Sequence, residues 1–317
     1  MLTMMVQKSK WIRGVDADAP VTAVARQALE WRLELVWHYL RRAGERHPDP
    51  EDVHQLRVAT RRAAATVEAY RDLLSAKRHE WFANALDKIR KAAGDARDFD
   101  VLLMRLDIRL ADEIQEHWKL LGERIQQLRK ESQKPIRKIS RRMHAKDYLD
   151  RVEALADRIA WRVDDQPEPS FGQAARARLQ GLAAPFFTAG KGDLLDIESL
   201  HQFRILGKAL RYGIEIFSAA MASEMRREVY PLIVQLQEKL GQINDHASAV
   251  TRFQTWASEW NEPELADALE TLVIEEKTAL QESRRDFQTW WTQQRALELE
   301  DRFQSSLRGD VADVMSA

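Results

Sequence analysis

Several residue types and patterns are scarce or missing in this sequence of 317 residues. It contains no cysteine, which excludes disulfide bonds and thiolate metal or redox sites. No apolar run approaches the length of about 18 residues that a membrane helix needs, and the stretch from Met1 to Trp11 lacks the apolar core of a signal peptide. These absences predict a cytoplasmic protein with no membrane partner.

Glycine and proline are also scarce, with 12 and 9 residues, whereas Ala, Leu, Glu, Arg and Gln are abundant. Because glycine and proline disfavour helix interiors and the abundant types favour them, this composition predicts an all-α fold. The length suits about two modules, and the best linker is the segment from Asp164 to Pro169, with two prolines and three acids. We therefore predict four-helix modules at 20–165 and 166–300, with tails at 1–19 and 301–317.

One pattern occurs twice, 147 residues apart. The first copy is His54-Gln55-Leu56-Arg57, followed by Arg61 and Glu68; the second is His201-Gln202-Phe203-Arg204, followed by Lys208 and Glu215. The same offset carries Gly94 onto Gly241 and Asp98 onto Asp245. One register thus aligns two separated segments, which predicts a duplicated helical module.

Helical spacing places the basic residues of each copy on one face. On a helix, His54, Arg57 and Arg61 fall within about 60° of one another, and the set from His201 to Arg211 within about 80°. Apolar residues such as Leu56 occupy the opposite side, so that side should face a core. Asp49 with Pro50, and Asp196 with Ser199, are expected to cap the two helices.

The same periodicity predicts four helices in each module. In the first module they are 21–43, the His54 helix to about 74, about 80–110, and about 111–163, with Pro135 as a bend or division. In the second they are 170–189, the His201 helix to about 220, about 225–259 and about 262–300. Residues 303–317 show little periodicity and are expected to fray. We expect Gly94 and Gly241 to allow close packing of helices.

Charge is segregated, although the net charge is only −1. Between Arg124 and Lys146 there are nine Lys or Arg residues against one Glu, whereas residues 254–301 hold twelve acids against four Lys or Arg. The basic segment contains one stripe at helical spacing, formed by Lys130, Lys134, Arg137, Lys138 and Arg141. Its partner is expected to be an anion; alternatively, it is a solvated face or opposes the acidic segment within the fold.

These motifs together resemble the CHAD family, the conserved histidine α-helical domain. The resemblance rests on the two His-x-x-Arg helices, with Arg61-Arg62 after the first and Lys208-Ala209-Leu210-Arg211-Tyr212 after the second. It also rests on Gly94-Asp95-Ala96-Arg97-Asp98 and Leu240-Gly241-Gln242-Ile243-Asn244-Asp245. It covers about residues 20–300. The Glu-x-Glu-x-Lys motif of the CYTH domain, to which this family is often fused, is not found at the start of the chain.

The resemblance implies two antiparallel four-helix bundles with pseudo-twofold symmetry and a basic surface or central pore. It also implies that inorganic polyphosphate is the ligand and that polyphosphate granules are a candidate location, with polyphosphate-metabolising enzymes as candidate partners. Arginine, lysine and histidine suit this ligand because each offers a cationic donor to phosphate oxygens. The expected binding residues are His54, Arg57, Arg61, Arg62, Lys91, Lys130, Lys134, Arg137, Lys138, Arg141, His201, Arg204, Lys208, Arg211 and Tyr212.

Ala64 and Ala65 stand where the second copy has Arg211 and Tyr212, so the two copies are expected to be unequal. We interpret Asp98, Asp245, Glu68 and Glu215 as carboxylates that orient the basic side chains. No catalytic residue, metal or other cofactor is expected. Two other functions stay open: a metal-dependent phosphohydrolase or metal-binding protein, and nucleic-acid binding through the same basic surface. Against the first, no His-x-x-x-His or clustered carboxylate motif appears.

Overall fold

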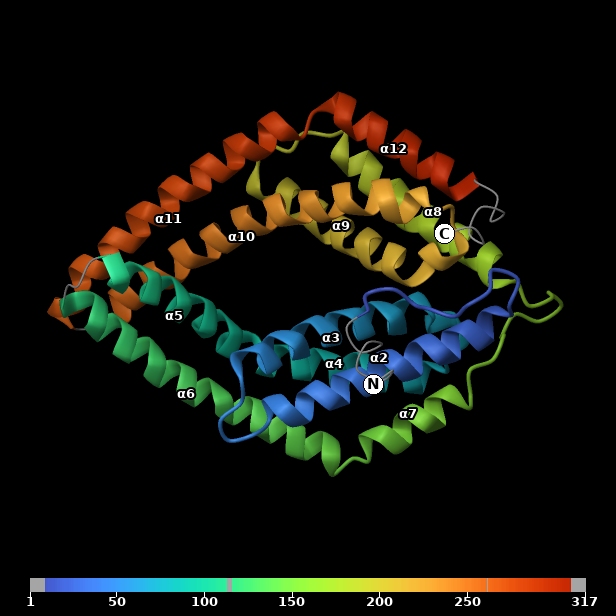
Figure 1. The fold of residues 1–317 in the computed structure, drawn as a ribbon, viewed down its shortest axis with the longest axis horizontal. Coiled ribbons are helices and arrows are strands. Elements are labelled where there is room, and N and C mark those ends of the chain that lie inside the picture. Colours follow the sequence, from blue (N-terminus) through green and yellow to red (C-terminus); the bar gives the residue numbers. More distant parts are fainter. Residues whose placement is uncertain (1–8, 113–115, 261, 309–317) are drawn as a thin grey trace. The chain divides into compact units, whose positions relative to one another are not determined.

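The structure is a computed structural model that describes residues 9–112, 116–260 and 262–308. The regular elements in these ranges are helices (Figure 1), as the composition predicts. The described residues form two compact units, which we call unit 1 (residues 20–168) and unit 2 (residues 9–19 and 169–308).

Unit 1 is built around two central helices, α2 and α3, whose apolar faces pack against each other. Helix α3 also packs on α4 and α5, α5 packs on α6, and α2 packs on α7. Leu29, Leu56, Phe82 and Ile136 are among the buried core residues, and each such side chain contributes about 1.5–3 kcal/mol. The helices are α2 (Val21–Ala43), α3 (Pro50–Ala69), α4 (Ala76–Ala92), α5 (Gly94–Asp112), α6 (Glu116–His144) and α7 (Tyr148–Ala156), with a 3-10 turn at Arg71–Leu73.

Unit 2 has a core rich in phenylalanine. The rings of Phe186 and Phe203 stack with centroids 5.0 Å apart, which joins α8 to α9, and Phe187 meets Phe303 at 5.7 Å, which joins α8 to α12. Helix α10 packs on both α9 and α11. The elements are α8 (Phe171–Gly190), α9 (Ile197–Phe217), a 3-10 turn (Ser218–Ala220), a π-helical turn (Met225–Val229), α10 (Tyr230–Glu259), α11 (Pro263–Trp290) and α12 (Gln293–Arg308).

Both helices that carry the repeated motif begin where the sequence predicts. The Asp49 carboxylate accepts a hydrogen bond from the Glu51 backbone amide at 2.8 Å, and Pro50 occupies the first helical position. The Asp196 carboxylate accepts from the Ser199 backbone amide at 2.9 Å and from its hydroxyl at 2.5 Å. The two predicted caps are confirmed, and each motif lies in the first turns of its helix.

The helices of unit 2 recur at the offset of the sequence repeat. Adding 147 to the bounds of α3, 50–69, gives 197–216, and α9 is Ile197–Phe217. The same addition takes α6 from 116–144 to 263–291, and α11 is Pro263–Trp290. The match fails at Ala93, which separates α4 from α5, whereas the equivalent residue Leu240 lies inside the continuous helix α10.

The predicted helix divisions need correction. The helix expected over 80–110 is divided at Ala93. Pro135 does not divide the next one: it lies inside α6, which ends at His144, and Asp147 turns the chain toward α7 with a φ of 51°. The helix expected over 262–300 is likewise two helices, α11 and α12. Each unit therefore contains more helices than the four predicted.

The predicted tails also differ from the structure. Helix α12 continues to Arg308 and buries Phe303 and Leu307, so residues 301–308 are not a tail. Residues 9–19 pack on unit 2, because the carbonyl of Ala19 accepts from the amide of Phe171 at 2.8 Å and the side chain of Ile12 is buried. The rest of the two predicted tails, 1–8 and 309–317, lies outside the described residues.

Candidate functional site

In unit 1, the basic residues of the first motif lie on one face of α3. The opposite face, with Leu56, Ala63 and Val67, is buried. His54 and Arg61 are half-buried on the polar face, so their apolar atoms are covered while part of each side chain stays accessible. The predicted separation of basic and apolar positions around this helix agrees with the structure, because the apolar side chains are buried and the basic ones are partly accessible.

Arg57 connects α3 to the junction between α4 and α5. Its guanidinium donates to the carbonyl oxygens of Gly94 at 3.0 Å and Ala93 at 3.4 Å, and it lies 3.9 Å from the Asp98 carboxylate. A cation at the end of a helix is favourable because the last carbonyls carry partial negative charge. Arg57 thus stabilises the junction and is held in one orientation by it.

Arg97, from the first turn of α5, joins the three α3 residues. Burial lowers the pKa of the His54 imidazole, and the positive charges of Arg97, Arg61 and Arg57 lower it further, against the opposing effect of Glu51. Burial likewise lowers the pKa of Arg57, where Asp98 opposes and Arg61, Arg97 and Arg90 reinforce the shift. We call His54, Arg57, Arg61 and Arg97 the α3 bank. The buried Nε of Arg61 has no hydrogen-bond partner among the described residues.

Two predicted residues lie at the edge of this bank. Arg62 is half-buried on α3 but does not figure among the charges that shift the pKa of His54 or Arg57. Lys91 is exposed on α4, where its ammonium pairs with the Asp87 carboxylate at 2.8 Å. In the sequence analysis Arg97 is only part of the motif from Gly94 to Asp98, and Arg90 is not predicted to belong to the site. Their place beside the His-x-x-Arg helix depends on the α4–α5 junction, which has no clear local signal.

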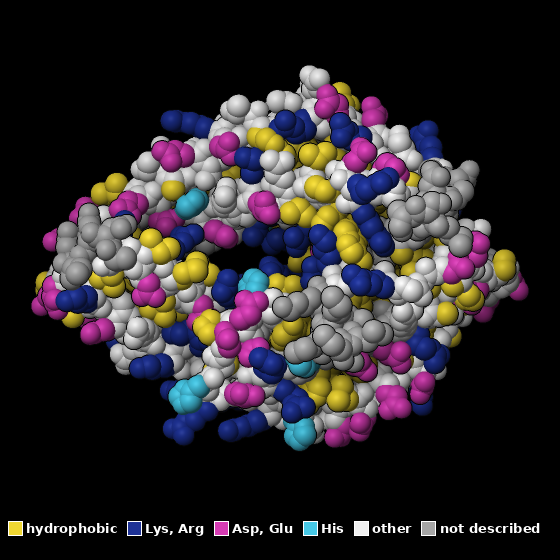
Figure 2. Space-filling view, viewed as in Figure 1, with side chains coloured by type: hydrophobic (Ala, Val, Ile, Leu, Met, Phe, Trp, Pro, Cys, Tyr) yellow, Lys and Arg dark blue, Asp and Glu magenta, His cyan; other side chains and the backbone are white. Residues whose placement is uncertain are grey.

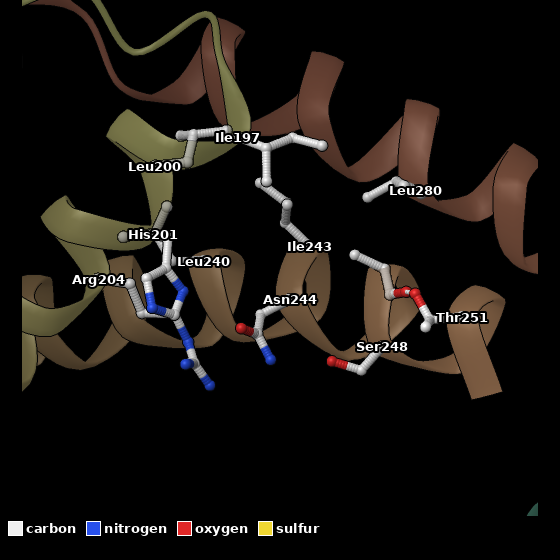
Figure 3. A pocket seen from close by; sticks show the side chains of 11 residues that line it. Ile197, Leu200, His201, Arg204, Leu240, Ile243, Asn244, Ser248, Thr251 and Leu280 are labelled. Atoms are coloured by element: carbon white, nitrogen blue, oxygen red, sulfur yellow. Dashed lines mark hydrogen bonds between the residues drawn. The ribbon is translucent and has the colours of Figure 1, made fainter.

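In unit 2, the second motif lines a pocket of about 210 Å³ between α9, α10 and α11 (Figure 3). His201 and Arg204 lie side by side on one wall, and the polar ends of Arg204, Asn244 and Ser248 point to the same side (Figure 3). The remaining lining is mostly apolar, formed by Ile197, Leu200, Leu240, Ile243, Ala247 and Leu280, with Thr251 at one end. His201 is exposed, unlike the half-buried His54.

Further along α9, Arg211 has an environment of its own. Its guanidinium lies 4.7 Å from the centroid of the Tyr212 ring. Burial acts to lower the pKa of Arg211, but Tyr212, Glu215 and Tyr230 together raise it. Tyr212 is buried, so its ring supports Arg211 and does not form an exposed surface for a ligand. Lys208, between Arg204 and Arg211, is half-buried. We call His201, Arg204, Lys208 and Arg211 the α9 bank; in Figure 2, Lys and Arg side chains gather on the visible face near α9.

The predicted basic stripe lies on α6. Four of its members are exposed, and Arg137 is half-buried with its Nε buried. The other face of α6, including Leu121, Ile125 and Ile136, is buried against unit 1. The charges that shift the pKa of His54 and Arg57 come from α3, α4 and α5, and no member of this stripe is among them. Its members are Lys130, Lys134, Arg137, Lys138 and Arg141, which we call the α6 stripe.

The four carboxylates of the motifs have different partners. Asp98 pairs with Arg57, and Glu215 is one of the charges that raise the pKa of Arg211, in agreement with their interpretation as orienting groups. Glu68 instead pairs with Arg71 at 3.1 Å and His79 at 3.0 Å, outside the bank. The Asp245 carboxylate accepts from the Asn244 amide at 3.5 Å.

The explanation of the two motif glycines by close packing is not supported. A Cβ on Gly94 would meet the Arg57 guanidinium at an ordinary 3.5 Å, and a Cβ on Gly241 would meet nothing within 4 Å. Close approach occurs instead at Gly207, where a Cβ would lie 2.3 Å from the Gln237 amide nitrogen. The tight crossing of α9 and α10 is thus at a glycine that the repeat does not include.

The described residues contain neither a group of metal ligands nor a membrane-spanning helix. Within residues 9–112, 116–260 and 262–308, no three His, Asp or Glu side chains come close enough together to share a metal ion. Over the same described ranges, every helix is too short or too polar to span a bilayer.

Known proteins resemble this chain in sequence and fold. Its sequence matches the CHAD domain family over residues 27–254. The crystal structure of the CHAD domain from the plant Ricinus communis has 20% sequence identity and a TM-score of 0.71, covering 94% of this chain and 96% of that one. PptA from Streptomyces chartreusis has 19% identity and a TM-score of 0.55, covering 86% and 99%. No curated protein matches the sequence significantly.

Proposed function

This chain belongs to the CHAD domain family, and on that premise we propose that it binds inorganic polyphosphate without acting on it chemically. The α3 bank and the α9 bank are the principal contacts, and the α6 stripe extends the basic surface of unit 1. The resemblance of the motifs to those of the family is the reason for naming polyphosphate. The proposal includes a cytoplasmic location on polyphosphate granules, in company with enzymes that make or degrade the polymer.

The observation that carries the proposal is the crowding of positive charge in the α3 bank. His54, Arg57, Arg61 and Arg97 lie close enough for the arginines to lower the pKa of the imidazole. Like charges at such range disfavour one another unless an anion lies between them. Asp98 is the carboxylate that opposes this repulsion at Arg57, at a long 3.9 Å. A phosphate chain would supply the missing negative charge.

The chemistry of the banks suits a polymer with no bases or sugars to recognise. Each internal phosphate carries about one negative charge, so affinity depends on many cationic donors along one surface. An arginine guanidinium can donate hydrogen bonds to two phosphate oxygens at once, while a lysine ammonium supplies a mobile point charge. The spacing of one helical turn between Arg57 and Arg61, and between Arg204 and Lys208, repeats a donor about every 6 Å.

We also infer that units 1 and 2 derive from a duplicated helical bundle. The offset of 147 residues relates the motifs in the sequence, and the same offset relates α3 to α9 and α6 to α11. The helices that carry the banks would then have a common origin. Their different neighbours would reflect later divergence.

The direct test is a variant with His54, Arg57, His201 and Arg204 all changed to alanine. Binding of long-chain polyphosphate at low salt should weaken at least about 100-fold, because four charge-assisted contacts are lost. Affinity of the wild type should fall steeply with rising salt. Circular dichroism and thermal unfolding would establish that the variant is folded.

A matched control removes the same number of basic side chains from exposed positions outside the banks. Arg41, His47, Arg178 and Arg308 are all exposed, and their change to alanine should alter affinity only slightly. Unchanged affinity in the folded bank variant would contradict the proposal for the two banks and move the site to the α6 stripe. Displacement of polyphosphate by RNA at equal phosphate concentration would favour nucleic-acid binding instead.

A further inference from the structure

The pocket beside His201 and Arg204 has a wall that inorganic phosphate does not need. Phosphate oxygens are fully charged and strongly hydrated, so apolar side chains offer them nothing. Yet Leu280 from α11 and Ile243 from α10 close this pocket opposite the basic residues (Figure 3). At its rim, Ile197 is 54% exposed, which leaves a large apolar side chain in contact with water. A ligand with an apolar part would cover it.

The polar lining of the pocket is also more varied than the α3 bank. Asn244 and Ser248 lie one turn apart on α10 and point toward the same side as Arg204 (Figure 3). An amide both donates and accepts hydrogen bonds, and so does a hydroxyl. Such groups suit the edge of a heterocyclic base or a sugar hydroxyl, which both donate and accept hydrogen bonds. An ionised phosphate, in contrast, can only accept them.

Unit 1 differs at the positions that make the apolar wall. Subtracting 147 takes Leu240 to Ala93, Ile243 to Ala96 and Leu280 to Gln133. Gln133 is buried, and its amide donates to the carbonyls of Ala43 at 2.6 Å and Glu45 at 3.1 Å. The larger apolar side chains are therefore particular to unit 2.

The two units also differ at the polar residue that a neighbouring helix places beside the His-x-x-Arg motif. Asn244 is equivalent to Arg97, the residue that brings a further positive charge to the α3 bank. Unit 1 thus concentrates charge at this place, whereas unit 2 has an amide next to an apolar wall. The two banks suit different ligand chemistry.

We propose that the unit 2 pocket binds a nucleoside phosphate, with its phosphates on His201 and Arg204 and its base between Ile197, Ile243 and Leu280. The inference rests on the proposed function, because it extends the α9 bank by a contact for an organic group. The volume of about 210 Å³ is below the range of about 300–1,000 Å³ that is typical of pockets for drug-sized ligands. It suits one base, with the phosphate chain extending along α9.

The test compares ATP with inorganic tripolyphosphate by calorimetry, without divalent cations. Both carry three phosphates, and tripolyphosphate is the more highly charged, so simple attraction to cations favours it. Burial of the base should reverse this order, and wild-type protein should bind ATP about tenfold more tightly. Long-chain polyphosphate is titrated in parallel as a measure of the proposed function.

Two variants and a control locate the effect. Leu280→Gln introduces the residue type that unit 1 has, and Ile197→Gln changes an exposed rim residue whose loss the fold tolerates. Each should abolish the preference for ATP while leaving tripolyphosphate binding within about twofold of wild type. Ile274→Gln is the control, because Ile274 lies on α11 with Leu280, is 58% exposed and does not line the pocket. It should keep the preference.

The outcomes separate the two proposals. Polyphosphate binding with no preference for ATP would overturn the nucleoside phosphate site and leave the proposed function standing. A preference for ATP that survives both pocket variants would also overturn the site. ATP binding without polyphosphate binding would support the pocket and contradict the proposed function. Binding of neither ligand would overturn both.

Discussion

The equivalent helices of the two units, α6 and α11, have nearly opposite surfaces. Helix α6 carries nine Lys and Arg residues and three Asp and Glu residues. Helix α11 carries three Lys and Arg residues and seven Asp and Glu residues. The offset of 147 residues relates the two helices, and both bury an apolar face. The difference shows that packing constrains only one side of these helices, so the charge of the other side is free to follow function. What recurs in both units is the basic face of α3 and α9.

A second contrast concerns the glutamate that ends each motif. Glu215 is buried, and its carboxylate accepts a hydrogen bond from the Tyr230 hydroxyl at 2.8 Å. Glu68, at the equivalent position, is exposed and pairs with Arg71. The same residue in the same motif is therefore a core group in unit 2 and a surface group in unit 1. At the equivalent of Arg211, unit 1 has Ala64.

The largest effect is expected from alanine at these two glutamates. Glu215→Ala removes a buried acceptor from Tyr230 and a negative charge from Arg211, and should lower the free energy of unfolding by about 3 kcal/mol. Glu68→Ala should change it by no more than about 0.5 kcal/mol, because the group is exposed. Urea unfolding of both variants measures the difference. Equal losses would contradict the contrast between the units.

A smaller effect is expected from removing positive charge from α6 and from its equivalent α11. Lys130→Gln combined with Lys138→Gln on α6 should weaken binding of long polyphosphate about tenfold. The slope of the logarithm of affinity against the logarithm of salt concentration should become shallower by about two, because about two fewer counterions are released. The equivalent pair on α11, Lys277→Gln with Arg285→Gln, is the control and should have little effect, since acids surround it. Fluorescence titration at several salt concentrations gives both quantities. Equal losses from the two pairs would show that binding does not distinguish the basic helix α6 from the acidic helix α11.

The sequence predicted those features that depend on local pattern. Helical periodicity and the scarcity of glycine and proline are properties of each segment, so the helices and the caps at Asp49 and Asp196 followed from them. The motifs were also sufficient to identify the family. The position of His54, Arg57 and Arg61 on the polar face of α3 followed from their spacing alone.

Features that depend on contacts between helices did not follow from the sequence. Ala93-Gly94 and Leu240-Gly241 are similar dipeptides, yet only the first interrupts a helix. Arg57, which comes from a different helix, donates to the two carbonyls at that interruption. Likewise, Pro135 is tolerated inside α6. The pocket of unit 2 needs side chains from three helices, and no spacing within one segment encodes it.

The smallest effect is expected from pH and tests whether His54 belongs to a crowded cationic bank. Burial and Arg97 hold the pKa of His54 below its ordinary value of about 6.5. Well above pH 6.5 the imidazole is neutral in both the folded and the unfolded chain. As the pH falls below about 6.5 toward the lowered pKa, the unfolded chain takes up the proton first, so the folded protein loses stability. A bound polyanion favours the charged imidazole, so affinity for polyphosphate should rise a few-fold over the same window. Internal phosphates of a long chain stay ionised in this pH range, so the ligand does not cause the change.

His54→Gln should remove both the loss of stability and the gain in affinity, whereas His47→Gln, at an exposed position outside the bank, should keep both. Persistence of both effects in His54→Gln would place the responsible group elsewhere.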